Sequence, residues 1–299
     1  MRMISAQRQP GGRYAAWRKI WHGAEALVTA GGWPARLAAL LGAPANVAVE
    51  HHDVEAPTAL GRASTLRIAF AADFHAGPTT QDELIENAVQ QLTAVAPDIL
   101  LLGGDFVSIR AAYARPLARR LEQIPAPLGR FAVLGNHDIW ADGPAVERHL
   151  LDAGIEVLTN RSTQLPEPFG NVSICGLDDH TSGTPDAAAA FKGSQDVRIV
   201  LMHAPSGLLD IGDRRFRVAL CGHTHGGQVS LPNGRPIKVA HGPLSRRYNA
   251  GRFELGGGRT LLVSRGVGCT TVPVRANAQA AVMTCNIRVV QADGRTLPV

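Results

Sequence analysis

The central part of the chain alternates short hydrophobic runs with longer amphipathic stretches. Short hydrophobic runs of this kind are typical of strands that are buried on both faces of a sheet. They predict strands at residues 66–72, 98–102, 131–134, 197–202 and 218–221. Hydrophobic residues at helical spacing predict amphipathic helices at residues 82–95 and 112–121. Strands that alternate with helices predict an α/β fold built on largely parallel strands.

Each predicted strand is followed closely by residues that can bind metal ions. Asp73 and Asp105 are 32 residues apart, and Asp105 and Asn136 are 31 apart, close to the roughly 30 residues of one strand–helix–strand unit. Because open α/β sheets hold their ligands at the carboxyl ends of the strands, we expect these residues to meet at one edge. They are Asp73, His75, Asp105, Asn136, His137, His203, His223 and His225.

The chemistry of this set indicates a hydrolytic centre with two metal ions. It combines two carboxylates, an amide oxygen and several imidazoles, and imidazole suits manganese, iron, zinc and nickel alike. Taken alone, Asp73 fits an ordinary helix cap or turn, and His203 fits a satisfied loop contact. The eight residues together, placed after five predicted strands, favour the metal centre.

Four motifs carry a resemblance to a known family. Asp-x-His, Gly-Asp, Gly-Asn-His-Asp and Gly-His-Thr-His, with a single histidine after the fourth strand, resemble the calcineurin-like metallophosphoesterases. The stretches GHTHGGQVSLP at residues 222–232 and SRGVGCTTVPVR at residues 264–275 are similar to a bacterial subgroup, the YkuE- and YaeI-like proteins. The resemblance implies a four-layer αββα sandwich, in which two mixed sheets are flanked by helices.

The resemblance also implies how the metal ions are held. One metal would be bound by Asp73, His75 and His225, and the other by Asn136, His203 and His223. Asp105 would bridge them, and a metal-bridging hydroxide would attack phosphorus in line. We expect manganese first, and iron, zinc, nickel and magnesium are also compatible with these ligands. Where many members of the family have Asp or Asn three residues after the second motif's aspartate, this chain has Ser108, a change that bears on metal preference.

Four further residues are candidates for catalysis and substrate binding. His137 would protonate the leaving group or stabilise phosphoryl oxygens, and Asp138 would orient its ring. Arg265 and Arg275 would bind substrate phosphate, because a guanidinium matches phosphate oxygens. For both arginines a surface or structural salt bridge is the alternative.

We expect two parts: a basic, partly amphipathic N-terminal appendage at residues 1–64 and a metallophosphoesterase domain at residues 65–299. The first twenty residues contain five Arg and Lys and no acid. Residues 1–60 either contact an anionic membrane or pack on the domain as an ordinary helix. The longest hydrophobic run, residues 37–49, is shorter than the ~20 residues of a spanning helix. We therefore expect a cytoplasmic protein, with association at the inner face of the membrane as an option.

Charge and composition narrow the class of partner. A formal net charge of +5 and a pI near 9.4 favour acidic partners. Only 5% of residues are aromatic and no base-reading motif is present, which argues against sequence-specific nucleic-acid binding. No obligatory protein partner is inferred. We predict a phosphodiesterase or pyrophosphatase acting on a phosphate ester, with a lipid-linked substrate left open. The alternatives are a nuclease of the same superfamily, or a catalytically idle basic protein of this fold that binds membrane or nucleic acid.

Overall fold

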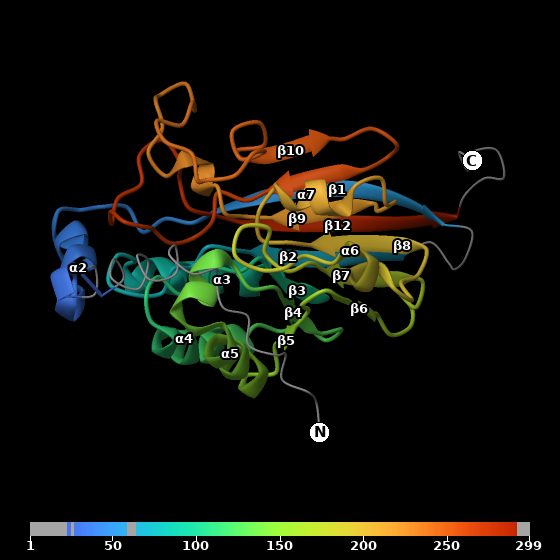
Figure 1. Cartoon of the computed structure of the whole chain (residues 1–299), viewed down its shortest axis with the longest axis horizontal. Helices are drawn as coiled ribbons and strands as arrows, with labels where there is room; N and C mark the ends of the chain where they lie inside the picture. Colours follow the sequence, from blue (N-terminus) through green and yellow to red (C-terminus); the bar gives the residue numbers. More distant parts are fainter. Residues whose placement is uncertain (1–22, 25–26, 59–63, 292–299) are drawn as a thin grey trace.

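The computed structural model describes residues 23–24, 27–58 and 64–291. Its centre consists of two six-stranded mixed sheets (Figure 1). The first sheet has the strand order β1-β12-β2-β3-β4-β5, and the second has the order β10-β11-β9-β8-β7-β6. Most neighbouring strands are parallel. The exceptions are the antiparallel pairs β12 with β2, β10 with β11, and β6 with β7.

The hydrophobic runs of the sequence become strands at the centres of the sheets. The five predicted strands are confirmed as β2, β3, β4, β8 and β9, each within two residues of the expected bounds. The first sheet contains β1 (Ala48–Thr58), β2 (Ser64–Ala71), β3 (Ile99–Leu102), β4 (Arg130–Ala132), β5 (Glu156–Val157) and β12 (Ala281–Gln291). The second contains β6 (Arg161–Gln164), β7 (Val172–Gly176), β8 (Val197–Leu201), β9 (Val218–Cys221), β10 (Gly251–Glu254) and β11 (Thr260–Val263).

Helices cover the outer face of each sheet. The two predicted helices are confirmed as α3, which buries its predicted face, and α4, which a short 3-10 turn precedes. The helices are α2 (Trp33–Leu40), α3 (Asp82–Ala94), α4 (Ala114–Glu122), α5 (Asn136–Asp152), α6 (Ala187–Phe191) and α7 (Gly207–Ile211). Short 3-10 turns are η1 (Ala30–Gly32), η2 (Ala111–Tyr113) and η3 (His225–Gly227).

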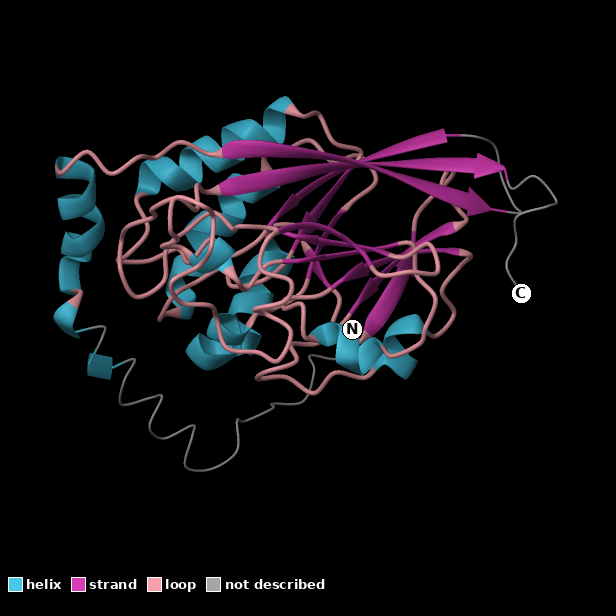
Figure 2. Cartoon of the chain, turned by 90° about the horizontal axis from the view of Figure 1, so that it is seen from above, coloured by secondary structure: helices cyan, strands magenta, loops and turns pink. Residues whose placement is uncertain are grey.

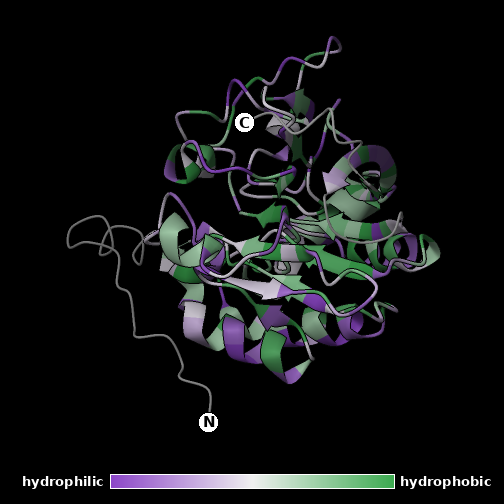
Figure 3. Cartoon of the chain, turned by 90° about the vertical axis from the view of Figure 1, so that its right-hand side faces the viewer, coloured by the Kyte–Doolittle hydropathy of each residue, from purple (hydrophilic) through white to green (hydrophobic). Residues whose placement is uncertain are grey.

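Three hydrophobic cores define four layers (Figure 2). The first core lies between the first sheet and α3, α4 and α5, and the third lies between the second sheet and α6 and α7. The middle core contains residues of both sheets, such as Phe70 from β2 and Ile199 from β8. Viewed from one end, hydrophobic strands lie inside and hydrophilic positions concentrate on the outer helices (Figure 3). The predicted four-layer αββα sandwich is confirmed.

Strand β1 joins the first sheet as its edge strand. It pairs in parallel with β12 from Ala48↔Ala281 to Thr58↔Gln291. The sheet therefore starts before residue 65, within the segment predicted as an appendage. The division of the chain at residue 64 stays a prediction of domain organisation, but Ala48–Thr58 is an integral part of the sheet.

The segment before β1 contributes α2, which packs through one face only. Pro34, Ala35 and Ala38 are buried, whereas Trp33 and Leu40 are 51% and 85% exposed. The basic residues Arg2 to Lys19, on which the membrane prediction depends, lie outside the described residues. Among the residues that are described, no helix has the length and hydrophobicity that crossing a membrane requires.

Candidate metal centre

The loops that follow strands of the two sheets meet at one edge of the sandwich. From the first sheet, Asp73 N donates to Gly104 O at 2.9 Å, and from the second, Gly222 N donates to His203 O at 2.9 Å. The backbone N–H of His223 joins the two pairs, because it contacts both carboxylate oxygens of Asp73 at 3.0 and 2.9 Å. The edge at which the candidate ligands meet is therefore formed by loops of both sheets.

Five of the candidate ligands have a left-handed backbone. A positive φ is rare for residues other than glycine, costs of order 1–3 kcal/mol, and clusters at functional sites. The five are Asp73 (φ 55°), His75 (φ 43°), Asp105 (φ 54°), His223 (φ 72°) and His225 (φ 54°). The fold thus holds the backbone at these five residues in a conformation that it would not adopt by local preference.

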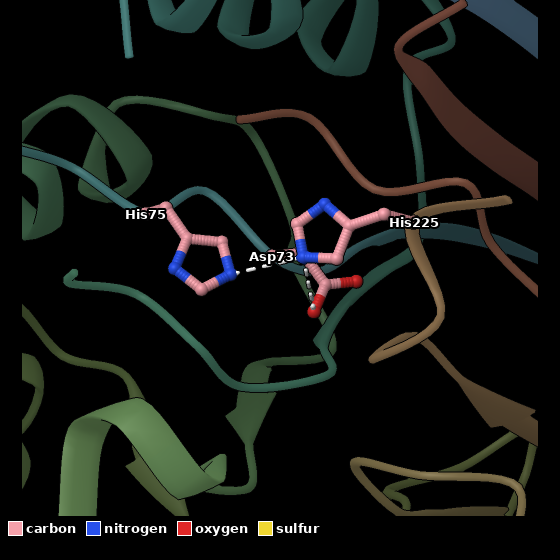
Figure 4. A group of neighbouring side chains, drawn as sticks. All are labelled: Asp73, His75 and His225. Carbon is pink, nitrogen blue, oxygen red and sulfur yellow. Dashed lines mark hydrogen bonds and ion pairs between the residues drawn. The ribbon is translucent and has the colours of Figure 1, made fainter. Parts of the chain in front are cut away.

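Asp73, His75 and His225 form a first group, and their side chains point toward one another (Figure 4). Nε2 of His75 lies 3.0 Å from Nε2 of His225, which lies 3.8 Å from Oδ1 of Asp73. All three side chains are buried. Ligand atoms about 2.1 Å from one cation lie roughly 3 to 4 Å from each other, so these spacings fit a single divalent metal ion.

Asp105, His203 and His223 form a second group beside the first. Nε2 of His203 lies 3.1 Å from Nδ1 of His223 and 3.2 Å from Oδ1 of Asn136. Oδ2 of Asp105 lies 3.3 Å from Nε2 of His203 and 3.4 Å from Nε2 of His75. The carboxylate of Asp105 therefore lies between the ring of His203, in the second group, and the ring of His75, in the first.

The donor set fits divalent transition metals. It offers imidazole nitrogens, carboxylate oxygens and one amide oxygen, and none of its members is a thiolate. Backbone carbonyls fix two of the rings: Nδ1 of His203 donates to Gly103 O at 2.8 Å, and Nε2 of His223 donates to His241 O at 2.7 Å. The opposite nitrogen of each ring then directs its lone pair into the centre, as in histidines that bind metal ions.

Two motif glycines allow the backbone to approach the ligands. A Cβ at Gly222 would collide with the carboxylate of Asp73, and a Cβ at Gly135 would collide with Asp105 and with the ring of His203. The Gly-Asn-His-Asp and Gly-His-Thr-His motifs therefore need glycine at these positions for space around the candidate ligands.

Burial and neighbouring charges set the protonation of the group. Burial lowers the pKa of His75 to about 3 and that of His223 to about 4, so both rings are neutral at pH 7. Burial, reinforced by repulsion from Asp105, raises the pKa of Asp73 to about 7. For Asp105 burial is outweighed by the positive charge of His203, which holds the pKa of that carboxyl well below its usual range. Of Asp73 and Asp105, Asp105 is therefore the carboxylate that ionises at the lower pH.

His137 lies beside the centre but belongs to neither of the two groups described above. Its backbone N donates to Oδ1 of Asp105 at 2.8 Å, and its ring meets that of His75 edge-on, with centroids 4.7 Å apart. Its Nδ1 donates to Ser108 O at 2.9 Å. A cation could also be held by His75, Asp105 and His137. The ring is partly exposed and so can reach a bound substrate.

The expectation that Asp138 orients His137 needs correction. Oδ2 of Asp138 accepts the N–H of Gly135 at 2.9 Å, and Oδ1 accepts the N–H of Val107 at 3.1 Å. Both oxygens thus satisfy backbone donors at the start of α5, and the ring of His137 is oriented by the Ser108 carbonyl instead. Sequence reasoning missed this contact because a backbone acceptor leaves no residue-type signal.

The two candidate arginines are occupied by contacts within the protein. Nε, Nη1 and Nη2 of Arg275 donate to the carbonyls of Gly268, His225 and Ala278, and Nη2 also lies 3.2 Å from Nδ1 of His225. Arg265 pairs with Glu50 of β1 and donates to Gln279 O. The salt-bridge alternative weighed above thus describes Arg265, whereas the contacts given for Arg275 are to backbone carbonyls and to the ring of His225. Phosphate binding by the two arginines stays a prediction. In its favour, both side chains line a cavity of about 520 Å³, together with Pro44, Asn46, Asn277, Gln279 and Ala280.

Comparison with known proteins places this geometry in a family. The family model "Calcineurin-like phosphoesterase" matches residues 66–227. The metallophosphoesterase YkuE of Bacillus subtilis is 29% identical over 231 residues, which cover 74% of this chain and 79% of YkuE. Phosphodiesterase YaeI of Escherichia coli is 32% identical over 215 residues, which cover 69% of this chain and 76% of YaeI. Among solved structures, TT1561 of Thermus thermophilus matches with a TM-score of 0.43 and 14% identity, over 68% of this chain and 91% of its own.

Proposed function

The chain belongs to the calcineurin-like phosphoesterase family, and from this premise we propose that it hydrolyses phosphodiester or pyrophosphate bonds at a centre for two divalent metal ions. Family membership makes it a metal-dependent phosphoester hydrolase. The proposal adds the class of bond, the number of metal ions and the residues that act. The name of the relative YaeI, a phosphodiesterase, favours a diester.

One relationship carries the proposal: the carboxylate of Asp105 lies between two groups of ligand atoms. Its Oδ2 is within 3.4 Å of a ring nitrogen in each group. A carboxylate placed in this way can be shared by two cations and lower their mutual repulsion. One cation would be held by Asp73, His75 and His225, and the other by Asn136, His203 and His223, with Asp105 shared.

Two bound cations would supply Lewis acidity, which acidifies a water nucleophile and neutralises charge on phosphoryl oxygens during in-line displacement. The chain's own residues supply position and protons. The carbonyls of Gly103 and His241 hold His203 and His223 in the tautomers that a cation needs. No side chain is then required as a nucleophile. Manganese remains our first expectation for the metal, because the donors are nitrogen and oxygen only.

His137 is the residue proposed to handle the leaving group. Its Nδ1 donates to Ser108 O, so the proposed contact with substrate would be made through Nε2. From there it would donate a proton to the departing oxygen or a hydrogen bond to a phosphoryl oxygen. Its backbone N–H bond to Asp105 at 2.8 Å holds the residue beside the shared carboxylate.

Hydrolysis of bis(p-nitrophenyl) phosphate with manganese tests the proposal. We expect turnover by the purified full chain, and its loss on chelation or in Asp105→Ala. The matched control is Asp82→Ala, because Asp82 is a carboxylate on the exposed face of α3 that pairs with Arg120; this variant should keep full activity. A chain that binds two metal ions but cleaves no diester, pyrophosphate or nucleic acid would contradict the proposal and favour the idle binding protein. Cleavage confined to nucleic acid would favour the nuclease.

We also propose that the N-terminal segment contacts an anionic membrane, at its inner face, and that the substrate is lipid-linked. The observation in favour is α2, which exposes Trp33, Leu37 and Leu40 and which follows the basic start of the chain in sequence. Because β1 belongs to the sheet, a test deletion must end well before Ala48. Removal of residues 1–22 should weaken association with phosphatidylglycerol liposomes and spare turnover of the soluble diester. Unchanged association would exclude a role for these residues.

A further inference from the structure

Exposed hydrophobic side chains gather at the end of the molecule that carries the candidate metal centre. Of the twelve large hydrophobic residues that are exposed in the described part of the chain, ten fall in three segments. One segment is residues 27–41, which contains α2, and the others are the loops after β9 and β11. Figure 1 places α2 and both loops at the same end. In the loops the exposed residues are Leu231, Ile237, Val272 and Val274, which we call the apolar rim.

The apolar rim is one surface, although it comes from two loops. Val229 and Ala276 form a β-bridge, and Asn277 Nδ2 donates to Ser230 O at 2.9 Å. The buried side chain of Gln228 braces the second loop: its Nε2 donates to the carbonyls of Thr270, Val272 and Val274 at 3.1, 2.8 and 3.2 Å. These bonds hold the backbone from which Val272 and Val274 project.

The rim is connected to the candidate metal centre by short, buried links. Gln228 stands three residues after His225, and Arg275, next to Val274, lies 3.2 Å from Nδ1 of His225. Helix α2 is linked to the same loops, since Ala35 N donates to Pro78 O at 3.1 Å and Thr79 Oγ1 donates to Cys269 O at 2.8 Å. The rim is therefore joined directly to the loop that carries the candidate ligand His225.

Charge around the rim is positive. The loop after β9, residues 222–250, contains Arg235, Lys238, Arg246 and Arg247 and no Asp or Glu. Arg235 and Lys238, which flank the tip at Ile237, are exposed, and neither is paired with a carboxylate within the described ranges. Hydrophobic tips bordered by unpaired cations are typical of surfaces that lie in the interface of an anionic bilayer.

We propose that the apolar rim docks on an anionic lipid bilayer and that the metal centre acts there on a phosphodiester carried by a membrane lipid. This inference rests on the proposed hydrolytic function. Water would add its oxygen to phosphorus, one P–O bond to an alcohol would break, and that alcohol would take up a proton, leaving a phosphate monoester. The rim would bring the centre to the level of the lipid head groups, which a soluble substrate would not require.

Vesicle co-sedimentation of the full-length chain tests the docking surface. Ile237→Glu should weaken binding to vesicles of phosphatidylglycerol and phosphatidylcholine by about tenfold or more, because it would place a charge where an exposed hydrophobic tip enters the bilayer. Arg235→Gln and Lys238→Gln should each cost about fivefold on these vesicles and nothing on pure phosphatidylcholine. The matched control is Leu209→Glu on α7, since Leu209 is 55% exposed but lies outside the rim; it should bind normally.

Two outcomes would overturn the inference: unchanged vesicle binding in Ile237→Glu, or an equal loss in Leu209→Glu. Turnover of bis(p-nitrophenyl) phosphate by the same preparations separates this inference from the proposed function. If the wild-type chain cleaves neither the soluble diester nor pyrophosphate nor nucleic acid, the hydrolytic proposal fails. If it cleaves the soluble diester, and every variant keeps that turnover, vesicle binding alone decides the role of the rim. A rim that binds a protein instead would show no dependence on anionic lipid.

Discussion

Nη2 of Arg275 lies 3.2 Å from Nδ1 of His225, a proposed metal ligand. The same guanidinium also donates to the carbonyls of Gly268, Ala278 and His225 itself. Arg275 thus joins the loop after β11 to the turn that carries His225. We infer that its main role is to hold this ligand in place.

Arg275→Met should lower both stability and turnover. The substitution leaves several buried carbonyls without a donor, so we expect the free energy of unfolding to fall by about 3 kcal/mol. Loss of a group that orients a metal ligand should reduce turnover by about 10- to 100-fold. Chemical denaturation and the diester assay measure the two effects.

Arg265→Met provides the comparison, because Arg265 is an arginine of the same loop region whose side chain is 32% exposed and pairs with Glu50. A partly exposed ion pair contributes about 1 kcal/mol or less. If Arg265→Met raised the KM for the diester while stability held, Arg265 would bind substrate. Equal stability losses in the two variants would contradict the role given to Arg275.

The position of Asp105 predicts a specific pattern of metal loss. Wild-type protein should contain about two metal ions per chain, and His225→Ala and His223→Ala should each retain about one. Asp105→Ala should retain neither, because its carboxylate is shared by both groups. Elemental analysis after gel filtration measures these ratios. Retention of one full equivalent by Asp105→Ala would show that the carboxylate serves one cation only.

His137→Ala should reduce kcat while leaving both metal ions bound. Loss of a general acid lowers turnover by about 10²- to 10⁴-fold, and the two ligand groups do not need this ring. Steady-state kinetics with elemental analysis of the same sample tests the assignment. A variant that lost one metal equivalent would make His137 a ligand together with His75 and Asp105.

Asp138→Ala should affect stability more than catalysis. Two buried N–H groups, those of Gly135 and Val107, would lose their acceptor. We expect the free energy of unfolding to fall by about 2–3 kcal/mol. Turnover at a temperature where the variant stays folded should change much less than in His137→Ala. A loss of kcat as large as that of His137→Ala would restore the catalytic role first expected for Asp138.

Local sequence predicts the strands and indicates the candidate ligands because both depend on features that are short in sequence. Hydrophobic runs identify β2, β3, β4, β8 and β9, and the residues after them form the two ligand groups. The pairing of β1 with β12 was not predictable in this way, since its partners are 233 residues apart along the chain, as His51 and Thr284 illustrate. The register of such strands depends on the folded sheet and not on any local pattern.

Side-chain roles were harder to predict than side-chain positions. An aspartate next to a histidine suggests a pair, but the turn at Gly135 directs Asp138 to backbone donors and leaves His137 to the Ser108 carbonyl. The same applies to the left-handed backbone at Asp73 and Asp105, which residue type alone does not indicate. In both cases the determining partner is the backbone of another segment.

Metal binding should release protons at pH 6. For His203 the carboxylates of Asp105, Asp179 and Asp73 outweigh burial and raise the pKa well above its usual value, and the pKa of Asp73 is raised to about 7. Both groups therefore carry protons at pH 6 in the metal-free protein and must lose them to bind a cation. His223, with a pKa of about 4, is already neutral and has none to lose.

We expect about one to two protons released per chain at pH 6, with apparent affinity rising as pH rises and release declining above the pKa values of these groups. Calorimetric titration with manganese in buffers of different ionisation enthalpy measures the number. His203→Gln should reduce it by about one, whereas His223→Gln, which also loses a ligand of the second group, should leave it nearly unchanged. Equal reductions in the two variants would mean that the protons come from elsewhere in the centre.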